Sequence, residues 1–498
     1  MTPGSQPARP LEAPEPAPAA RAPVKPAKPI RDWPGVDLLD RYPFVRKVLK
    51  WRPLQFWLIW PNVLFFAAFL YAGLFGSPVG SRNVMIVFVW IFWWFLLIAL
   101  LVPFLSRAWC TVCPLPVFGE WLQRLRFVGV RSGEGPKKQR TRMFGLNLEW
   151  PRALQNIWLQ NLGFLCLASF SALLVTRPIV STFVLGGMIV LAVALSLVFR
   201  QRAFCMYLCP VSGFLGLYSM TSTLAVRVKD PTLCRSHKEK ECLLGCESGY
   251  GCPWFQYVGG MTRNNYCGMC FECVKTCPYD NVTVFLRPFC SDRLLKGYDE
   301  AFKAFIMLVL ALVYSVTLLG PWGTVKDWAN ISEVGNWKGF GLYVLAVFGL
   351  CLGVFPALHL AMTWLGRRLA NEPKARLGDS FVRYAYVWVP LGLFAWIAFS
   401  VPLMAVNGAY ILSTLSDPLG HGWDLFRTGS VQWHPLLPEW IGLVQLPLLL
   451  AGLYVSLSSS WRIGRELYAD SHKALLSLAP TWAFAATMTV ALMCFFVG

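Results

Sequence analysis

The sequence predicts an all-α polytopic membrane protein of about nine transmembrane helices, with one cysteine-rich segment inserted between them. Three observations support this fold class: an apolar composition, apolar stretches of spanning length, and basic residues gathered in alternate loops. Of the 498 residues 56% are hydrophobic and only 14% are charged, and the mean hydropathy is +0.50. A soluble domain could not bury so much apolar surface, so the composition indicates a membrane protein.

The apolar stretches are about 20 residues long, which is the length that crosses the hydrocarbon core of a bilayer as a helix. We expect helices at residues 54–75, 83–105, 157–176, 180–198, 302–320, 340–364, 382–405, 439–457 and 479–497. The third and fourth are the shorter ones, and Gln160 and Asn161 interrupt the third. Residues 1–35 are rich in Pro and Ala and lack the apolar core of a signal peptide, so we expect a disordered cytoplasmic tail.

Basic residues gather before the first stretch and after the second, fourth, sixth and eighth. They are Arg41, Arg46, Lys47, Lys50 and Arg52; Arg124, Arg126, Arg131, Lys137, Lys138, Arg140 and Arg142; Arg200 and Arg202; Arg367, Arg368, Lys374 and Arg376; and Arg462, Arg465 and Lys473. By the positive-inside rule, the N-terminus and the cysteine-rich segment lie in the cytoplasm, which we take to be that of a bacterium with the chain in its inner membrane. The net charge of +19 is thus a topology signal, and we expect no nucleic-acid partner.

The most specific pattern is a run of four cysteines, Cys267, Cys270, Cys273 and Cys277, followed by Pro278. Its C-x2-C-x2-C-x3-C-P spacing is that of bacterial ferredoxins, which bind [4Fe–4S] clusters. In two-cluster ferredoxins, the fourth cysteine of such a run binds the other cluster. The run therefore predicts a second set of ligands.

That set lies just upstream, at Cys234, Cys242, Cys246 and Cys252, with Pro253 after the last. The ferredoxin pattern predicts crossed ligands. Cys252 would complete the cluster of Cys267, Cys270 and Cys273, and Cys277 would complete the cluster of Cys234, Cys242 and Cys246. Because the upstream spacing is irregular, a single cluster, or one cluster with a structural zinc, are alternatives. Cys290 lies nearby in the sequence and could replace a misassigned ligand.

These motifs divide the chain into four expected parts. Residues 1–35 are the tail, 36–222 a membrane domain with two helix hairpins, 223–298 a cytoplasmic ferredoxin-like 2[4Fe–4S] segment, and 299–498 a five-helix membrane domain.

Each hairpin of the first membrane domain is followed by a cysteine pair. Cys110 and Cys113 precede Pro114, Cys205 and Cys209 precede Pro210, and an arginine (Arg107 or Arg202) comes before each pair. Four thiols brought together could hold a third [4Fe–4S] cluster or a copper ion, or act as redox thiols. Four buried structural cysteines are the alternative.

The sequence C-M-Y-L-C-P at 205–210 and the run ending at Pro278 resemble motifs of the NapH, NosR and CcoG group of polytopic iron–sulfur proteins. The resemblance covers roughly residues 54–290. It implies membrane-attached electron transfer to a respiratory reductase or, for CcoG-like members, copper handling during oxidase assembly. The pair at Cys110 and Cys113 is one residue shorter than the C-x3-C of that group.

We expect a membrane-bound carrier of single electrons between a quinol or cytoplasmic donor and a redox partner complex. A copper-handling or copper-reducing assembly factor for a terminal oxidase is the main alternative, and a scaffold that anchors a redox enzyme is another. The sequence shows no Walker, dinucleotide-binding or zincin motif, so no substrate-turnover site is predicted. His359 lies in the sixth stretch and could ligate haem, although a histidine satisfied by a carbonyl is commoner. The external loop 406–438 could face a partner or line a quinone pocket.

Overall fold

The computed structural model describes residues 35–128, 144–319, 323–371, 376–429, 431 and 433–496. The expected tail, except Gly35, lies outside these residues, as do Arg131, Lys137, Lys138, Arg140, Arg142 and Lys374 of the basic loops. In the described part of the chain, eight helices are long and apolar enough to cross a membrane. The chain is therefore a multi-pass membrane protein.

Eight of the expected stretches coincide with these helices. The helices are α3 (Leu54–Phe75), Val84–Leu105, α11 (Pro178–Val198), Tyr298–Leu318, Trp337–Leu369, Leu377–Asn407, Pro438–Leu467 and α25 (Ser471–Phe496). Several of these helices consist of more than one element. Val84–Leu105 contains α4 (Val84–Ile86), α5 (Trp94–Leu96) and α6 (Val102–Leu105), with π-helical turns between them. Tyr298–Leu318 begins with α16 (Tyr298–Tyr314), and Pro438–Leu467 contains α24 (Ile441–Leu467). Trp337–Leu369 contains α19 (Trp337–Gly349) and α20 (Phe355–Leu369), and Leu377–Asn407 contains α21 (Leu377–Tyr384) and α22 (Trp388–Asn407).

The stretch expected at 157–176 is not one helix. It is divided into α9 (Trp158–Ser169) and α10 (Ser171–Thr176), which meet at Phe170. The Ser169 hydroxyl donates to the carbonyl of Leu165 at 2.9 Å, a bond that competes with the helical pattern and bends helices. About nine continuous spanning helices were expected, and the described residues contain eight.

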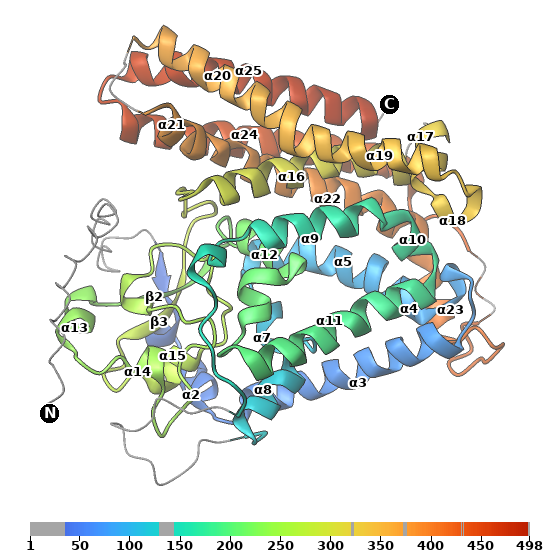
Figure 1. Ribbon diagram of the computed structural model, residues 1–498, viewed down its shortest axis with the longest axis horizontal. Coiled ribbons are helices and arrows are strands. Elements are labelled where there is room, and N and C mark those ends of the chain that lie inside the picture. Colours follow the sequence, from blue (N-terminus) through green and yellow to red (C-terminus); the bar gives the residue numbers. More distant parts are fainter. Residues whose placement is uncertain are drawn as a thin grey trace, which may run out of the picture.

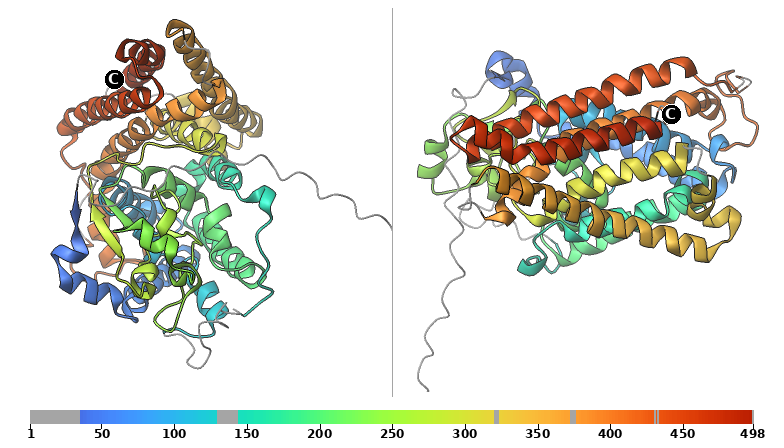
Figure 2. Two further views of the ribbon diagram at one scale, coloured as in Figure 1. Left: turned by 90° about the vertical axis from the view of Figure 1, so that its left-hand side faces the viewer. Right: turned by 90° about the horizontal axis from the view of Figure 1, so that it is seen from above.

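The helices run side by side in two groups, as the end-on view shows (Figure 2, left), and α22 contacts both groups. α22 packs against α16 and α24, and also against the second spanning helix and α12 (Pro210–Tyr218). α12 is short and is buried along its length, and the sequence did not predict it as an element. It carries the residues after Cys209 into the centre of the bundle.

A unit with a small antiparallel sheet lies at one end of the helices (Figure 1, left). The strand order is β1-β3-β2, with β1 at Val36–Asp37, β2 at Leu224–Val228 and β3 at Val282–Leu286. The short helices α13 (Pro231–Ser236), α14 (Glu241–Leu244) and α15 (Glu272–Thr276) lie between β2 and β3. The unit has its own apolar core, which includes Val226, Met269 and Val284.

This sheet is a departure from a strictly all-α fold. It also extends the cysteine-rich unit beyond residues 223–298, because β1 pairs with β3 through Val36 and Leu286. The following helices, α1 (Leu38–Arg41) and α2 (Pro43–Lys50), continue this attachment, since Lys50 pairs with Asp280. The chain just before the first spanning helix therefore belongs to the cysteine-rich unit.

The described basic loops lie at the same end of the bundle as this unit. In Figure 1 the start of α3, helix α8 (Val117–Arg124), the end of α11 and the turns from α20 to α21 and from α24 to α25 are all on that side. Helices α17 (Gly323–Ala329), α18 (Ile331–Val334) and α23 (Ala409–Ser416) lie at the other end. The charge asymmetry along the sequence thus becomes one basic end of the structure.

Candidate metal centres

The two cysteine pairs of the N-terminal hairpins sit on matching backbone turns. Ser106 and Gln201 have φ angles of 60° and 57°, in the left-handed region that non-glycine residues seldom adopt. Each is followed by an arginine, Arg107 or Arg202, and three residues later by the first cysteine of its pair. The second cysteine leads through proline into a short helix, α8 or α12.

The four cysteines of these pairs come together, and we call them the membrane-face group: Cys110, Cys113, Cys205 and Cys209. The thiol of Cys205 interacts electrostatically with those of the other three. Cys110, Cys205 and Cys209 are buried. Burial raises the pKa of Cys205 and Cys113 well above the usual range and that of Cys209 to about 12, because an isolated thiolate is costly in an apolar site.

The two arginines cross between the pairs. Arg107 donates to the hydroxyl of Ser212, on the α12 side, and to the carbonyl of Asn265 in the cysteine-rich unit. Arg202 donates to the carbonyl of Cys110 at 2.6 Å and forms an ion pair with Glu120. Each arginine thus joins its own hairpin to the other one.

Glu120 balances the charge of Arg202. Both side chains are buried. Burial alone would raise the pKa of Glu120, but the charges of Arg202 and Arg124 outweigh it and lower the pKa below its ordinary value. The carboxylate is therefore ionised at neutral pH, and Arg202 is neutralised within the protein.

Lys303 of α16 lies beside the membrane-face group, and we did not predict it from the sequence. Its side chain is fully buried, and its Nζ lies 4.5 Å from the centre of the Phe164 ring. Within the described part of the chain, Nζ has no hydrogen-bond partner, and it interacts electrostatically with Cys209. A single lysine inside the apolar stretch 302–320 was the available signal.

Cys252 lies with Cys267, Cys270 and Cys273, and we call these four the inner group. The Cys273 thiol interacts electrostatically with the other three, and that of Cys270 with Cys252 and Cys267. The crossed-ligand hypothesis assigns these four cysteines to one cluster. Burial raises the pKa of Cys252 to about 12 and that of Cys270 and Cys273 well above the usual range.

Backbone N–H groups point at the sulfurs of the inner group. Met269 and Phe271, between the cysteines of the run, have φ angles of 54° and 59°. Left-handed residues in such loops turn successive N–H groups inward, a concavity that binds anions and iron–sulfur clusters. The amides of Met269 and Glu272 bond the sulfurs of Cys267 and Cys270, and each of these bonds favours the thiolate.

The same backbone turn follows both Cys-Pro dipeptides of the unit. Phe255 and Asp280 have φ angles of 50° and 49°, and each stands three residues after its cysteine, Cys252 or Cys277. The two motifs therefore share local geometry although their cysteine spacing differs.

Cys234, Cys242 and Cys277 line a cavity of about 20 Å³. With Cys246 we call them the outer group. Cys246 is not among the lining residues, and its Sγ lies 2.8 Å from the hydroxyl oxygen of Ser248. The structure thus brings together three of the four predicted ligands around the cavity, and the Sγ of Cys246 lies 3.9 Å from the carbonyl oxygen of Thr276, next to Cys277. Asn281 donates to the Cys234 sulfur at 3.2 Å.

The three groups follow one another. Cys242 of the outer group interacts electrostatically with Cys252 and Cys273 of the inner group. Arg202 interacts with Cys205 and with Cys270, and so couples the membrane-face group to the inner group.

Arg107 makes a second link, because it interacts electrostatically with both Cys209 and Cys267. Its guanidinium lies 4.3 Å from the ring centre of Trp254, which is buried. A Cβ at Gly268 would lie 1.8 Å from the Trp254 indole nitrogen, so only glycine fits there. The Arg107–Trp254 stack thus packs tightly against the loop of the inner group.

Among the described residues, no three His, Cys, Asp or Glu side chains converge closely enough to hold a single metal ion. A tetrahedral zinc with Zn–S bonds of about 2.3 Å holds its sulfurs about 3.8 Å apart. A [4Fe–4S] cluster bonds each cysteine through a different iron and holds the sulfurs further apart. The chemistry of the donors agrees with such a cluster, since amides bond sulfurs of the inner group and three thiols of the outer group line a cavity.

Two other sequence candidates are placed differently. Cys290 lies beside Tyr386 and Ser459 of the C-terminal helices, so it packs there. His359 is fully buried and both its ring nitrogens have partners. Nδ1 accepts from the Trp388 indole at 3.1 Å, and Nε2 therefore donates to the Phe381 carbonyl at 3.0 Å. Neither nitrogen is free to bind haem in this arrangement.

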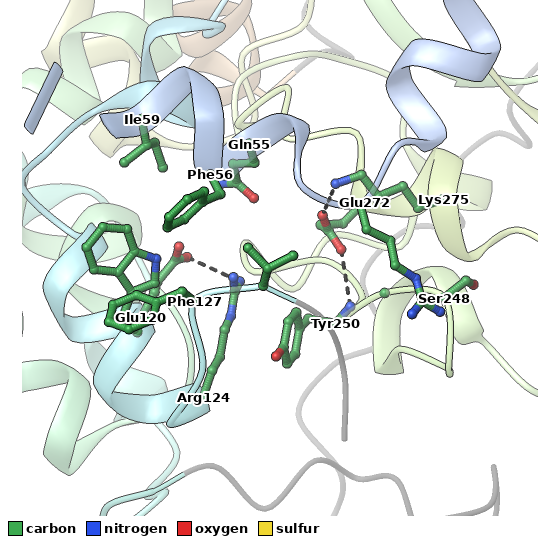
Figure 3. A pocket seen from close by; sticks show the side chains of 14 residues that line it. Gln55, Phe56, Ile59, Glu120, Arg124, Phe127, Ser248, Tyr250, Glu272 and Lys275 are labelled. Carbon is green, nitrogen blue, oxygen red and sulfur yellow. Dashed lines mark hydrogen bonds and ion pairs between the residues drawn. The ribbon is translucent and has the colours of Figure 1, made fainter. Parts of the chain in front are cut away.

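Two hollows lie away from the cysteines. At the end opposite the cysteine-rich unit, Arg82, Tyr410, Asp417, Trp423 and Trp433 line an open cavity of about 540 Å³, within reach of the loop 406–438. The other is a cleft of about 40 Å³ between α3, α8 and the cysteine-rich unit (Figure 3). In it Arg124 lies between Glu120 and Tyr250, and Glu272 pairs with Lys275.

Comparison with known proteins adds no family to this geometry. No protein-family model, no curated protein and no solved structure matches the chain. Its function has to be inferred from the three cysteine groups and from the charges around them.

Proposed function

We propose that this chain is a membrane-bound iron–sulfur protein that relays single electrons between a quinol or cytoplasmic donor and a redox partner complex. The observation that supports this best is the succession of the membrane-face, inner and outer groups, each coupled electrostatically to the next. One cluster alone could store an electron, whereas a series of neighbouring clusters conducts it. The resemblance to NapH-, NosR- and CcoG-like proteins agrees with this function.

In this proposal the inner and outer groups each bind one [4Fe–4S] cluster and the membrane-face group binds a third. The clusters supply one-electron chemistry. The chain supplies buried thiols, amides directed at sulfur and a shell that excludes water, which together set the reduction potentials. Cys246 has to turn from Ser248 toward the cavity of the outer group to complete its ligand set.

The orientation is part of the proposal. The described basic loops and the cysteine-rich unit share one end of the bundle (Figure 1), and the positive-inside rule assigns that end to the cytoplasm of a bacterial inner membrane. Thiols remain reduced there and can bind iron.

A quinol donor would approach from the bilayer edge. The cleft of Figure 3 lies at the start of α3, with Phe56 and Phe127 on one side and Glu272, next to Cys273, on the other. The Trp121 ring packs against both phenylalanines. Its space of about 40 Å³ admits a few waters, so a quinol ring would require an aromatic side chain to move.

Copper handling is the second candidate, favoured by the four soft thiols of the membrane-face group, three of which are buried. In that case the chain would act as an assembly factor for a terminal oxidase. The inner and outer groups would then supply the electrons that keep copper reduced.

Iron and acid-labile sulfide per chain, measured on anaerobically purified protein together with EPR of the reduced sample, test the proposal. We expect about twelve irons and coupled [4Fe–4S] signals. About eight irons with copper retained would favour the second candidate, and an absence of acid-labile sulfide would end both.

Ligand variants assign the clusters. Cys270→Ser should remove the inner cluster and Cys209→Ser the membrane-face cluster, each lowering the iron content by about four. Cys166→Ser is the matched control, because Cys166 is exposed on α9 and belongs to none of the groups. Equal iron content in all three variants would contradict the assignment.

A further inference from the structure

Lys303 differs from most buried cations of the described chain. Five others near the cysteines pair with carboxylates: Arg202 with Glu120, Arg263 with Glu300, Arg227 and Arg287 with Asp292, and Lys275 with Glu272. Lys303 has no such partner within the described residues, and its Nζ bonds nothing there. A buried ammonium without a counter-charge is strongly disfavoured.

The surroundings of Lys303 direct its charge toward the membrane-face group. Its Cε would lie 3.3 Å from a Cβ at Gly213, in the first turn of α12, and Gly213 bonds the carbonyl of Cys209. Gln160, beside the same glycine, donates to the carbonyl of Cys205 at 3.0 Å. On its other side Lys303 meets the Phe164 ring. The cysteines are thus the polar groups toward which the ammonium is placed.

A second positive charge stands at the same group. Arg107 is buried and donates to a hydroxyl and a carbonyl, and no described carboxylate pairs with it. Arg107 and Lys303 therefore leave the site with two positive charges that the protein itself does not balance. The site is built for an anion.

We propose that Lys303 is the counter-charge of an anionic [4Fe–4S] cluster held by Cys110, Cys113, Cys205 and Cys209, and that it raises the reduction potential of that cluster. This inference rests on the proposed electron-transfer function. With four thiolates such a cluster carries about two net negative charges when oxidised and about three when reduced. In reduction, one electron leaves the neighbouring cluster, which is oxidised, and enters this one, and no bond or proton changes place.

The charge bears on the occupants that the sequence left open. A disulfide is neutral and would leave both cations unbalanced. A copper(I) ion carries about one negative charge with two thiolates and about two with three, so it differs from a cubane in gaining no further negative charge on reduction. A cubane with four thiolates balances both, and its reduced form is stabilised further by the nearby ammonium.

Potentiometric EPR titration of the full chain in detergent tests the role of Lys303. In Lys303→Met, we expect one cluster signal to shift to a more negative potential while the other two stay in place. The shifted signal should be the one that Cys209→Ser removes. Lys303→Arg, if it fits, should keep the wild-type potential, and Lys303→Gln should behave like Lys303→Met. Lys338→Met is the matched control, since Lys338 is exposed in α19.

Iron-free protein gives an independent readout. Without a cluster, the buried ammonium has no counter-charge and destabilises the folded protein. Lys303→Met should therefore have a higher Tm than wild type after chelation, whereas Lys338→Met should not. An unshifted potential together with an unchanged Tm would overturn the role of Lys303. If Cys209→Ser lost no iron while about eight irons per chain remained, the membrane-face cluster would be excluded and the proposed function would stand on two clusters.

Discussion

Lys303 and His359 are both buried in the C-terminal helices, yet their polar atoms differ in hydrogen bonding. The histidine has an indole donor and a carbonyl acceptor, whereas the lysine ammonium has no hydrogen-bond partner in the described chain. Burial of an ionisable side chain in a spanning helix therefore does not by itself mark a functional site. A buried ammonium that interacts with Cys209 and has no hydrogen-bond partner in the described chain is more informative, because native proteins rarely leave a buried charge unpaired.

The chemistry of the two side chains explains the contrast. A neutral histidine has one donor and one acceptor, so two protein groups satisfy it completely. A lysine ammonium has three donors and a charge, and the Phe164 ring beside Lys303 offers it no hydrogen-bond acceptor.

Acid should produce the largest effect, because it acts on buried carboxylates that balance arginines near the cysteines. The arginines lower the pKa of Glu120 below its ordinary 4.5 and that of Asp292 below its ordinary 3.8, against the opposing effect of burial. A lowered pKa contributes stability above the unfolded value, and this is lost as pH falls through the folded pKa. Thermal unfolding of iron-free protein should therefore show Tm constant near neutrality and falling below about pH 4.5. A flat profile to pH 3 would contradict the buried ion pairs.

Glu120→Gln should produce the next largest loss of stability. It leaves Arg202 buried and unpaired, and removal of one member of a buried pair costs about 3–5 kcal/mol in free energy of unfolding. The control is Glu149→Gln, whose pair with Arg200 is exposed by 69% and 44% and is worth less than about 1 kcal/mol. Equal losses, measured by unfolding in detergent, would mean that Glu120 does not balance Arg202.

His359→Leu should have a smaller effect and should spare the clusters. It orphans the Trp388 indole and the Phe381 carbonyl, at about 1–3 kcal/mol. Iron content and EPR potentials should be those of wild type, in contrast to Lys303→Met. Loss of iron in His359→Leu would show that this pocket is part of the redox site.

The smallest effect should come from the surface attachment of α2. Lys50 and Asp280 pair while 37% and 48% exposed, so Lys50→Ala should cost less than about 1 kcal/mol and the cost should shrink in high salt. A larger loss in thermal unfolding would mean that this pair holds the N-terminal segment on the cysteine-rich unit.

The comparison also separates what the sequence could reveal from what it could not. The spanning helices were predicted within a few residues at most ends, because hydropathy over about 20 residues reports directly on the bilayer. The association of Cys252 with Cys267, Cys270 and Cys273 followed from ferredoxin spacing, which is a local code. Whether these cysteines bind iron stays a prediction.

The sequence could not reveal interaction partners that come from distant segments of the chain. Glu120, which neutralises Arg202 across 82 positions, and Lys303, which lies beside Cys209, are ordinary residues in their own stretches. The division of 157–176 at Phe170 falls inside an apolar stretch, so hydropathy does not reveal it. Strand β1 is two residues long, too short for any alternation of polar and apolar residues to identify it.

The pairing of β1 with β3 has a consequence for biogenesis. Val36 and Asp37 emerge from the ribosome some 250 residues before Phe285 and Leu286, their partners. At a synthesis rate of about 5–20 residues per second, β1 waits on the order of tens of seconds for its sheet. During this interval the spanning helices between them enter the bilayer and keep β1 on the side where the cysteine-rich unit forms. In our proposal, assembly of the iron–sulfur clusters therefore follows insertion of the first hairpins, since the cysteine-rich unit closes only when β3 arrives.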